Sequence, residues 1–301
     1  MTEPPIAILA FDHRAEFSRS VFDRDPEQLS PAEFAMLSEA KSLVFEGFLA
    51  ALPRLGEVQP GILADEEFGG VVLERSRERD FLLALPVERA DQEVFRFDYG
   101  DDFLEHITRY APDYAKALVR ISIHDEAGSI RLQLSRLRRL SDALAEAGIG
   151  FMFELVVRPS GRELEQVGLD TRRYEDELRP ETMRATMRLV QEAGIAVDVW
   201  KLQGIATQAD AESIAEQARS ANPDARCIVL GGAADPRRVD DWLDVAASTH
   251  GFAGFAFGRN IWRDALREWS VGAASPDEVV SRVARSYLDF TGAYLGATSR
   301  P

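Results

Sequence analysis

Short apolar segments and amphipathic segments alternate along most of the chain. The apolar segments hold four to eight residues, the length of a strand buried on both faces. Between them, apolar residues recur at helical spacing, and Ser30-Pro31 provides the N-cap and first-turn signals of a helix. The pattern predicts eight main strands, at residues 6–11, 61–64, 81–85, 114–121, 151–157, 197–203, 226–230 and 252–257. It predicts helices at residues 30–52, 71–79, 128–147, 180–193, 210–220, 236–248 and 276–294.

Apolar strands that alternate with helices are typical of a parallel sheet covered by crossover helices. Eight such units match a (β/α)8 barrel, so we expect residues 1–301 to form a single domain of this fold. A doubly wound sheet is the alternative, but it usually has a glycine-rich turn after its first strand, where this chain has Asp12-His13-Arg14. Residues 88–112 interrupt the pattern and predict only a short strand at 95–99 and a short helix at 102–110.

The segment 197–203 carries a lysine within an apolar strand. Its residues alternate, with Val199 and Lys201 on one face and Trp200 and Leu202 on the other. Burial favours the neutral amine, which can attack a carbonyl group and form a Schiff base. Only three of the 35 basic residues are lysines, and the guanidinium group of the others cannot form an imine. Lys201 is therefore either a Schiff-base nucleophile or the partner of a buried carboxylate.

Other ionisable residues lie near the carboxyl ends of the predicted strands. In a (β/α)8 barrel these ends meet at one mouth, which holds the active site. Glu154 lies in the apolar strand before that of Lys201 and is a candidate general acid and base, the alternative being an ion pair with a neighbouring strand. The remaining candidates at the mouth are Asp12, His13, Arg14, Asp65, Glu66, Lys116 and Arg120.

Glycine-rich turns follow the seventh and eighth predicted strands, at Gly231-Gly232 and at Gly258-Arg259. The loops after these two strands often form a phosphate site in this fold. Glycines let backbone N–H groups approach an anion, and Arg259 would open a short helix beside it. These four residues are candidates for phosphate binding, although glycines at such places also fit ordinary turns.

The composition limits the kinds of partner. A net charge of −16 argues against nucleic acids and anionic membranes. No apolar run approaches the roughly 20 residues needed to span a bilayer, and the N-terminus lacks the pattern of a signal peptide. The single cysteine, Cys227, allows no internal disulfide and lies in an apolar run, so we expect a core residue in a cytoplasmic protein.

The sequence predicts no metal site and no cofactor. The four histidines lack the spacing of metal ligands, and Asp65, Glu66 and Glu67 fit a solvated loop better than a site for a hard cation. Lys41 lies in a predicted helix, where we expect it to be solvated and protonated. Lys116 is expected to stay charged, because its expected task is to bind an anion.

Several motifs occur in the order in which one known family carries them. The specific motifs are Asp198-Val-Trp-Lys-Leu-Gln-Gly204 and Gly251-Phe-Ala-Gly-Phe-Ala-Phe-Gly-Arg259. Supporting motifs are Ala10-Phe-Asp-His-Arg14, Asp65-Glu-Glu-Phe-Gly69, Lys116-Ala-Leu-Val-Arg120 and Phe153-Glu-Leu155. From about residue 7 to residue 294, the chain resembles the aldolase domain of bacterial inositol catabolism, which cleaves 2-deoxy-5-keto-gluconate 6-phosphate. That family is related to the tagatose-bisphosphate and sulfofructose-phosphate aldolases.

The resemblance implies a class I aldolase on a (β/α)8 barrel, without metal. Lys201 matches the Schiff-base lysine, and Glu154 matches the acid/base glutamate of the tagatose-bisphosphate relatives. Asp12 matches the acid at the end of the first strand, while Lys116 and Arg120 match positions that line the substrate mouth.

Two residues depart from the family pattern. Gly232 stands where an arginine is usual, and Gln203 stands where an acidic residue is usual. Both are expected to face the substrate mouth, where Arg14, Asp65 and Glu66 are further candidates for substrate contact. The substrate can therefore differ from the inositol intermediate.

The expected reaction is reversible cleavage of a phosphorylated keto-sugar acid into dihydroxyacetone phosphate and malonate semialdehyde. A related ketose phosphate is the alternative substrate. Two other functions remain open: a metal-dependent lyase built on Asp65 and Glu66, and a barrel that only binds a sugar phosphate. Assembly into a homo-oligomer is also open.

Overall fold

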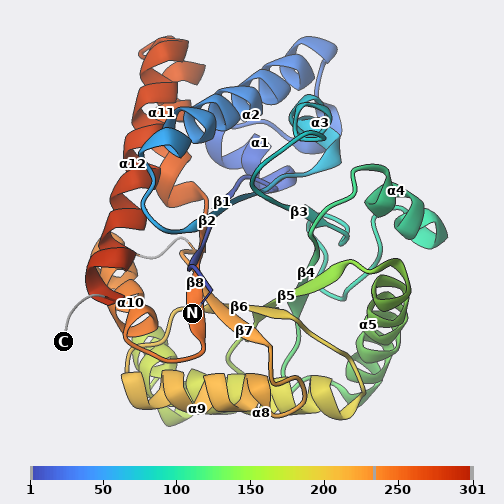
Figure 1. Ribbon diagram of the computed structural model, residues 1–301. Helices are drawn as coiled ribbons and strands as arrows, with labels where there is room; N and C mark the ends of the chain where they lie inside the picture. Colours follow the sequence, from blue (N-terminus) through green and yellow to red (C-terminus); the bar gives the residue numbers. More distant parts are fainter. Residues whose placement is uncertain (1–2, 233–234, 299–301) are drawn as a thin grey trace.

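All eight main predicted strands form, and each pairs in parallel with the next along the chain, while the eighth pairs with the first. The computed structural model describes residues 3–232 and 235–298, and in it the strands close into a barrel surrounded by helices (Figure 1). The predicted (β/α)8 fold is therefore confirmed. The strands are β1 Ile6–Ala10, β2 Gln59–Leu63, β3 Leu82–Pro86, β4 Tyr114–Arg120, β5 Gly150–Val156, β6 Val199–Gln203, β7 Arg226–Leu230 and β8 Phe252–Phe257.

The crossover helices form an outer ring around these strands (Figure 1). Ser30 caps α2 as predicted, since its side chain accepts from Glu33 N and the Glu33 carboxylate accepts from Ser30 N. The α-helices are α1 Ala15–Phe22, α2 Pro31–Ala51, α3 Glu66–Arg75, α4 Phe103–Arg109, α5 Ala127–Ala147, α6 Gly161–Gln166, α7 Thr171–Arg173, α8 Arg179–Glu192, α9 Gln208–Arg219, α10 Pro236–Ala247, α11 Arg259–Ser270 and α12 Pro276–Thr298. Single turns of other helix types lie at Pro26–Gln28, Leu52–Arg54, Gly100–Asp102 and Tyr174–Leu178.

Two apolar layers hold the barrel. One fills its interior and takes one or two side chains from most strands, among them Ile8, Met152, Val199 and Ile228. The other lies between the strands and the helices and contains most of the buried apolar residues. Cys227 lies in this outer layer, is fully buried as expected, and burial raises the pKa of its thiol to about 12.

The barrel closes where β8 passes β1. Gly254 has φ +138, and a Cβ atom there would lie 1.8 Å from the Ile6 carbonyl oxygen. The pairing of β7 with β8 shifts register between Cys227 and Val229, close to this glycine. A residue without a side chain is thus required at the join between the last strand and the first.

Four local predictions differ from the structure. Residues 95–99 form only an isolated antiparallel bridge, between Phe97 and Glu88, and no strand. The helix predicted from residue 71 begins at Glu66, because Asp65 caps it through Phe68 N. Helix α1 was not predicted: it has eight residues and no side-chain cap. Helix α11 begins at Arg259 as expected but has 12 residues.

Candidate active site

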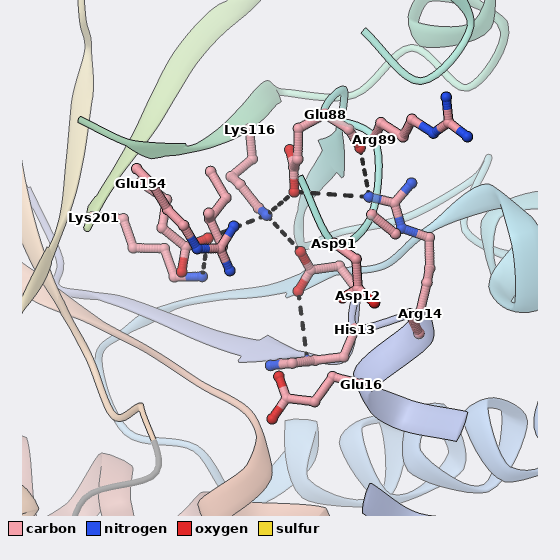
Figure 2. Close-up of a pocket in the computed structure, with 14 residues that line it drawn as sticks. Asp12, His13, Arg14, Glu16, Glu88, Arg89, Asp91, Lys116, Glu154 and Lys201 are labelled. Atoms are coloured by element: carbon pink, nitrogen blue, oxygen red, sulfur yellow. Dashed lines mark hydrogen bonds and ion pairs between the residues drawn. The ribbon is translucent and has the colours of Figure 1, made fainter. Parts of the chain in front are cut away.

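Five ionisable side chains converge at the carboxyl-terminal mouth of the barrel (Figure 2). Lys116, Glu154 and Lys201 project from the neighbouring strands β4, β5 and β6. Asp12 and Glu88 follow β1 and β3 by two residues each. All five line a small cavity of about 100 Å³. Parallel strands bring their carboxyl ends to one edge, which explains how residues so far apart in sequence meet.

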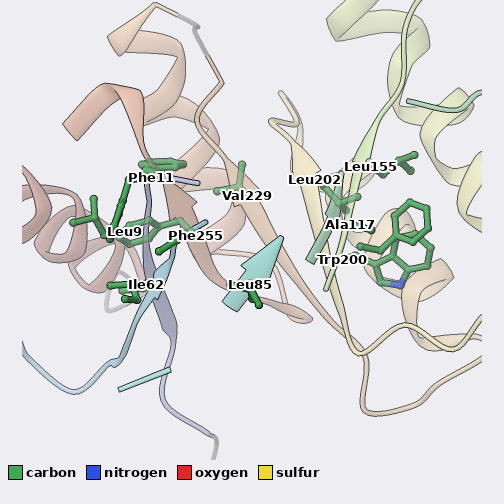
Figure 3. Close-up of a cluster of buried hydrophobic side chains, with 14 of the residues drawn as sticks. Leu9, Phe11, Ile62, Leu85, Ala117, Leu155, Trp200, Leu202, Val229 and Phe255 are labelled. Atoms are coloured by element: carbon green, nitrogen blue, oxygen red, sulfur yellow. The ribbon is translucent and has the colours of Figure 1, made fainter. Parts of the chain in front are cut away.

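Lys201 and Glu154 form an ion pair inside the mouth. The two residues are register partners of β6 and β5, and Lys201 Nζ lies 3.0 Å from Glu154 Oε2. Lys201 is 4% exposed and shares the inward face with Val199, while Trp200 and Leu202 pack in the outer layer (Figure 3). The predicted alternation and the predicted reach between the two side chains are confirmed. Whether they act in catalysis stays a prediction at this point.

Lys116 is the centre of the cluster. Its Nζ lies 2.7 Å from Asp12 Oδ2, 2.5 Å from Glu88 Oε1 and 3.1 Å from Glu154 Oε2. The contact with Glu88 is a hydrogen bond, and the carboxylates of Asp12 and Glu154 lie within ion-pair distance. Burial opposes the charge, but the carboxylates, Asp12 first, outweigh it and raise the pKa of Lys116. Lys116 is charged as expected, but its donors bind carboxylates of the protein rather than standing free for a substrate anion.

The three carboxyl groups around Lys116 differ in their electrostatics. Burial alone would raise the pKa of Asp12 and of Glu154, but Lys116 and Lys201 lower both below their ordinary values. For Glu88 burial dominates, and its pKa is raised despite Lys116 and Arg14. Asp12 and Glu154 are thus more acidic than ordinary carboxyl groups, whereas Glu88 is less acidic.

Two predicted arginines also line the cavity, and both hold the segment that follows β3. Arg14 Nη1 donates to Asp98 at 2.5 Å, and its Nη2 donates to the Glu88 carbonyl oxygen at 2.6 Å. Arg120 Nη1 donates to the Gln92 carbonyl oxygen at 2.8 Å. These bonds fix the loop that carries Glu88.

His13 also lines the cavity, next to Asp12. Its ring lies edge-on to Trp262 at a centroid distance of 5.5 Å. Burial lowers the pKa of His13 to about 4, although Asp12 opposes this. The imidazole is therefore neutral near neutral pH.

Glu88 was not predicted from the sequence. It follows β3 in Pro86-Val87-Glu88, at the start of the irregular stretch 88–112. The rule that selected Asp12, an acid just beyond a strand end, would have found it.

Asp65 and Glu66 were predicted at the mouth, and the structure corrects this. Asp65 is 1% exposed; its carboxylate pairs with Lys41 Nζ and caps α3. Glu66 binds the side chains of His106 and Arg109. Neither is among the described residues that line the cavity. The expectation that Lys41 is solvated is wrong, since it is fully buried and paired with Asp65.

Gln203 was expected to face the mouth. Its Oε1 instead accepts from Val157 N at 2.8 Å and so joins the ends of β5 and β6. Within the described residues that surround the cavity, Gln203 does not occur.

The two glycine-rich loops lie side by side. A Cβ atom on Gly231 would lie 2.6 Å from Asn260 Oδ1, and Gly258 occupies the N-cap position of α11. Gly232 has φ +56, and the next two residues of its loop, 233 and 234, lie outside the described part of the chain. Arg259 pairs with Glu16, which lines the cavity. Phosphate binding by these loops stays a prediction.

The metal alternative lacks support from side-chain geometry. The two acids on which it depends, Asp65 and Glu66, are engaged by basic side chains. In residues 3–232 and 235–298, no group of three His, Cys, Asp or Glu side chains is arranged to hold a metal ion. The same described residues contain no helix long and apolar enough to span a bilayer.

Comparisons with known proteins agree with the barrel fold. The model of the family described as "Uncharacterized protein conserved in bacteria (DUF2090)" matches residues 2–296. No match was found among curated proteins. Fructose-bisphosphate aldolase of Plasmodium falciparum is similar in structure, with a TM-score of 0.57 and 16% identity over 97% of this chain and 89% of that one. Cgl0159 of Corynebacterium glutamicum is similar with a TM-score of 0.55 and 18% identity over 93% of this chain and 85% of that one.

At such identities the two structures show that this chain has the barrel fold found in an aldolase. Reaction and substrate have to be argued from the site itself.

Proposed function

We propose that this chain, which belongs to the DUF2090 family, is a carbon–carbon lyase that forms a Schiff base at Lys201. The observation that carries the proposal is the 3.0 Å contact between Lys201 Nζ and Glu154 Oε2 inside the barrel mouth. An amine and a carboxylate in contact supply both the nucleophile and the proton acceptor that imine chemistry needs.

In the first step, Glu154 takes a proton from Lys201, and the free amine adds to the substrate ketone. Glu154 returns the proton to the hydroxyl group of the carbinolamine, which leaves as water, and an iminium ion remains. Lys116 lies 3.1 Å from Glu154 Oε2, and its positive charge stabilises the carboxylate form of Glu154 between proton transfers.

In the second step, Glu154 accepts the proton of the substrate hydroxyl group beyond the carbon–carbon bond that breaks. The bond's electron pair moves to the iminium nitrogen, which gives an enamine on Lys201 and a free aldehyde. Glu154 then protonates the enamine carbon, and water hydrolyses the iminium to release the ketone product. The cycle converts one substrate into one ketone and one aldehyde; the water taken up in the hydrolysis balances the water released earlier, and no oxidant or reductant is needed.

The proposed substrate is a phosphorylated keto-sugar acid, 2-deoxy-5-keto-gluconate 6-phosphate, which gives dihydroxyacetone phosphate and malonate semialdehyde. The sequence resemblance to the inositol-pathway aldolase supports this choice. A panel that also contains tagatose bisphosphate and sulfofructose phosphate tests it, and the highest kcat/KM identifies the substrate.

Covalent trapping tests the reaction class. Incubation with dihydroxyacetone phosphate and borohydride should reduce the imine, and peptide mapping should place the added mass on Lys201 alone. Lys41 is fully buried against Asp65, and the carboxylates around Lys116 raise the pKa of its amine and keep it protonated, so neither competes. An adduct on Lys116 with Lys201 unmodified would overturn the assignment. No adduct, together with binding but no turnover across the panel, would leave a barrel that only binds sugar phosphates.

A further inference from the structure

Strand β4 sends alternate side chains into the barrel mouth. Lys116, Leu118 and Arg120 line the mouth cavity, whereas the residues between them pack in the outer apolar layer. Arg120 is the last residue of β4 and is partly exposed. Leu118 pairs in register with Glu154, so Arg120 stands two residues, roughly 6.6 Å, nearer the solvent than the catalytic cluster.

The charges around the mouth cavity differ in whether they are already paired. The described lining holds as many acids as lysines and arginines, so its preference for a ligand depends on which cations are engaged. Lys116, Lys201 and Arg14 each form an ion pair with a carboxylate. The other two, Arg89 and Arg120, form no ion pair within the described chain.

The two unpaired arginines differ in direction. Arg89 is exposed, and Figure 2 shows its side chain directed away from Lys116 and Lys201. Arg120 belongs to the inward face of β4, and its Nη1 donates to the Gln92 carbonyl oxygen at 2.8 Å. A guanidinium group has five N–H donors, and the edge formed by Nε and Nη2 has no acceptor among the described residues. Arg120 therefore offers the mouth a cation and a donor pair that the protein leaves unused.

A second cavity, of about 260 Å³, also borders Arg120, which is the described residue that lines both cavities. The lining of this second cavity contains three acids, Glu93, Asp125 and Glu126. Glu93 pairs with Arg158 at 2.5 Å and so does not neutralise Arg120. The acids oppose the entry of an anion beyond Arg120, so this arginine marks the end of the space in which an anionic group is stabilised.

The strand order places Arg120 and the predicted phosphate loops on opposite sides of Lys201. Lys201 lies on β6, the glycine-rich loops follow β7 and β8, and Arg120 ends β4. Two strand spacings, about 10 Å along the sheet, separate β4 from β6. When the ketone half is bound to Lys201 with its phosphate toward β7 and β8, the aldehyde half extends toward β4.

We propose that Arg120 binds the carboxylate at the far end of the aldehyde half, and that it thereby selects aldehydes that carry an anion. The inference rests on the proposed aldolase function. The planar fork of a guanidinium group matches a carboxylate through two parallel N–H···O bonds. Because the Gln92 carbonyl oxygen uses Nη1, it holds the side chain at the wall and leaves the edge of Nε and Nη2 for the substrate.

The condensation of aldehydes with saturating dihydroxyacetone phosphate tests the contact. Malonate semialdehyde carries the carboxylate, and its methyl ester is the uncharged counterpart, so the ratio of their kcat/KM values reports recognition of the anion. Arg120→Gln keeps a donor for the Gln92 carbonyl oxygen but loses the charge, and the ratio of acid to ester should fall at least about tenfold. Arg120→Lys keeps the charge and should retain more of the ratio than Arg120→Gln. An equal loss for acid and ester in Arg120→Gln would indicate a role in holding the loop alone and would overturn the proposal.

Arg89→Gln is the matched control. It removes the same charge from the lining of the same cavity, but from a side chain that is directed away from the cluster. Its ratio of acid to ester should stay within about twofold of wild type, because an exposed charge in water acts weakly. A fall as large as that of Arg120→Gln would mean that the general field of the mouth, and no contact with Arg120, sets the preference.

Trapping with dihydroxyacetone phosphate and borohydride separates the two levels of the inference. This ketone has no aldehyde half, so Arg120→Gln should still give an adduct on Lys201, which shows a folded variant with a reactive amine. An adduct in wild type together with an unchanged ratio in Arg120→Gln overturns the Arg120 proposal alone. A missing adduct in wild type overturns the aldolase function and the carboxylate contact together.

Discussion

The buried pair of Lys41 and Asp65 predicts a measurable coupling between two helices and the first strand. Lys41 Nζ donates to the Phe11 carbonyl oxygen at 2.7 Å, to the His13 carbonyl oxygen at 2.8 Å and to the Asp65 carboxylate. The second oxygen of Asp65 accepts from Phe68 N at 2.8 Å. One ammonium group thus joins α2 to both sides of Asp12 and to the start of α3.

Replacing Lys41 with methionine keeps the unbranched apolar stem, one atom shorter, but leaves the Asp65 carboxylate buried without its cation. Breaking a buried pair from one side costs about 3–5 kcal/mol. An unfolding entropy of about 2.1 cal/mol/K per residue makes each kcal/mol worth about 1.6 °C in Tm for a chain of 301 residues. The Tm of Lys41→Met should therefore fall by about 5–8 °C.

The double variant Lys41→Met/Asp65→Asn separates a buried charge from lost packing. The asparagine oxygen can still cap α3, and no charge is left unpaired. The double variant should be more stable than the sum of the single changes predicts, with a coupling of about 1–3 kcal/mol.

Thermal unfolding followed by circular dichroism at pH 7 measures the Tm of Lys41→Met, of Asp65→Asn and of the double variant. Arg77→Met is the matched control, because Arg77 and Glu74 form an ion pair that is about half exposed. Its Tm should change by less than about 1.6 °C. Additive changes for Lys41 and Asp65, or a loss below about 2 °C for Lys41→Met, would refute the reasoning.

Three further predictions concern the mouth. Lys201→Arg should keep the charge and lower kcat more than about 1,000-fold, because guanidinium forms no imine; activity near wild type would exclude the Schiff base. Arg259→Ala should raise the KM for dihydroxyacetone phosphate about tenfold, and an unchanged KM would remove the predicted phosphate site. Asp12 and Glu154 have lowered pKa values, so their contribution to stability is present above about pH 4 and lost as the pH falls through their folded-state pKa values. The Tm of wild type should therefore drop more between pH 7 and pH 3 than that of Asp12→Asn, and equal drops would contradict this.

The sequence was sufficient for those parts of the site that lie on regular strands. Alternation in 197–203 assigns Lys201 to the inward face, and the order of strands places Glu154 beside it. The first assignment follows from periodicity, which is a local property, and the second follows from the adjacency of consecutive strands in the barrel. Periodicity also predicted the eight strands and hence the barrel.

Residues outside regular elements were harder to assign. Glu88 lies in a loop without periodicity, and its position depends on the bonds of Arg14 and Arg120 to that loop. Lys41 and Asp65 are 24 residues apart and meet only through the packing of α2 on the barrel. No local pattern carries such a pairing, so an apparently solvated lysine and an apparent substrate ligand proved to be a buried pair.

The single thiol of Cys227 offers an intrinsic reporter of motion in the barrel. It is fully buried in β7, and its raised pKa of about 12 suppresses the reactive thiolate near neutral pH. Alkylating reagents can therefore reach it only when β7 separates from the helix layer, so the rate of modification measures the opening of the closed sheet. A cysteine engineered on the surface would react long before this one, which allows a single fluorophore or spin label to be attached without removing the native residue.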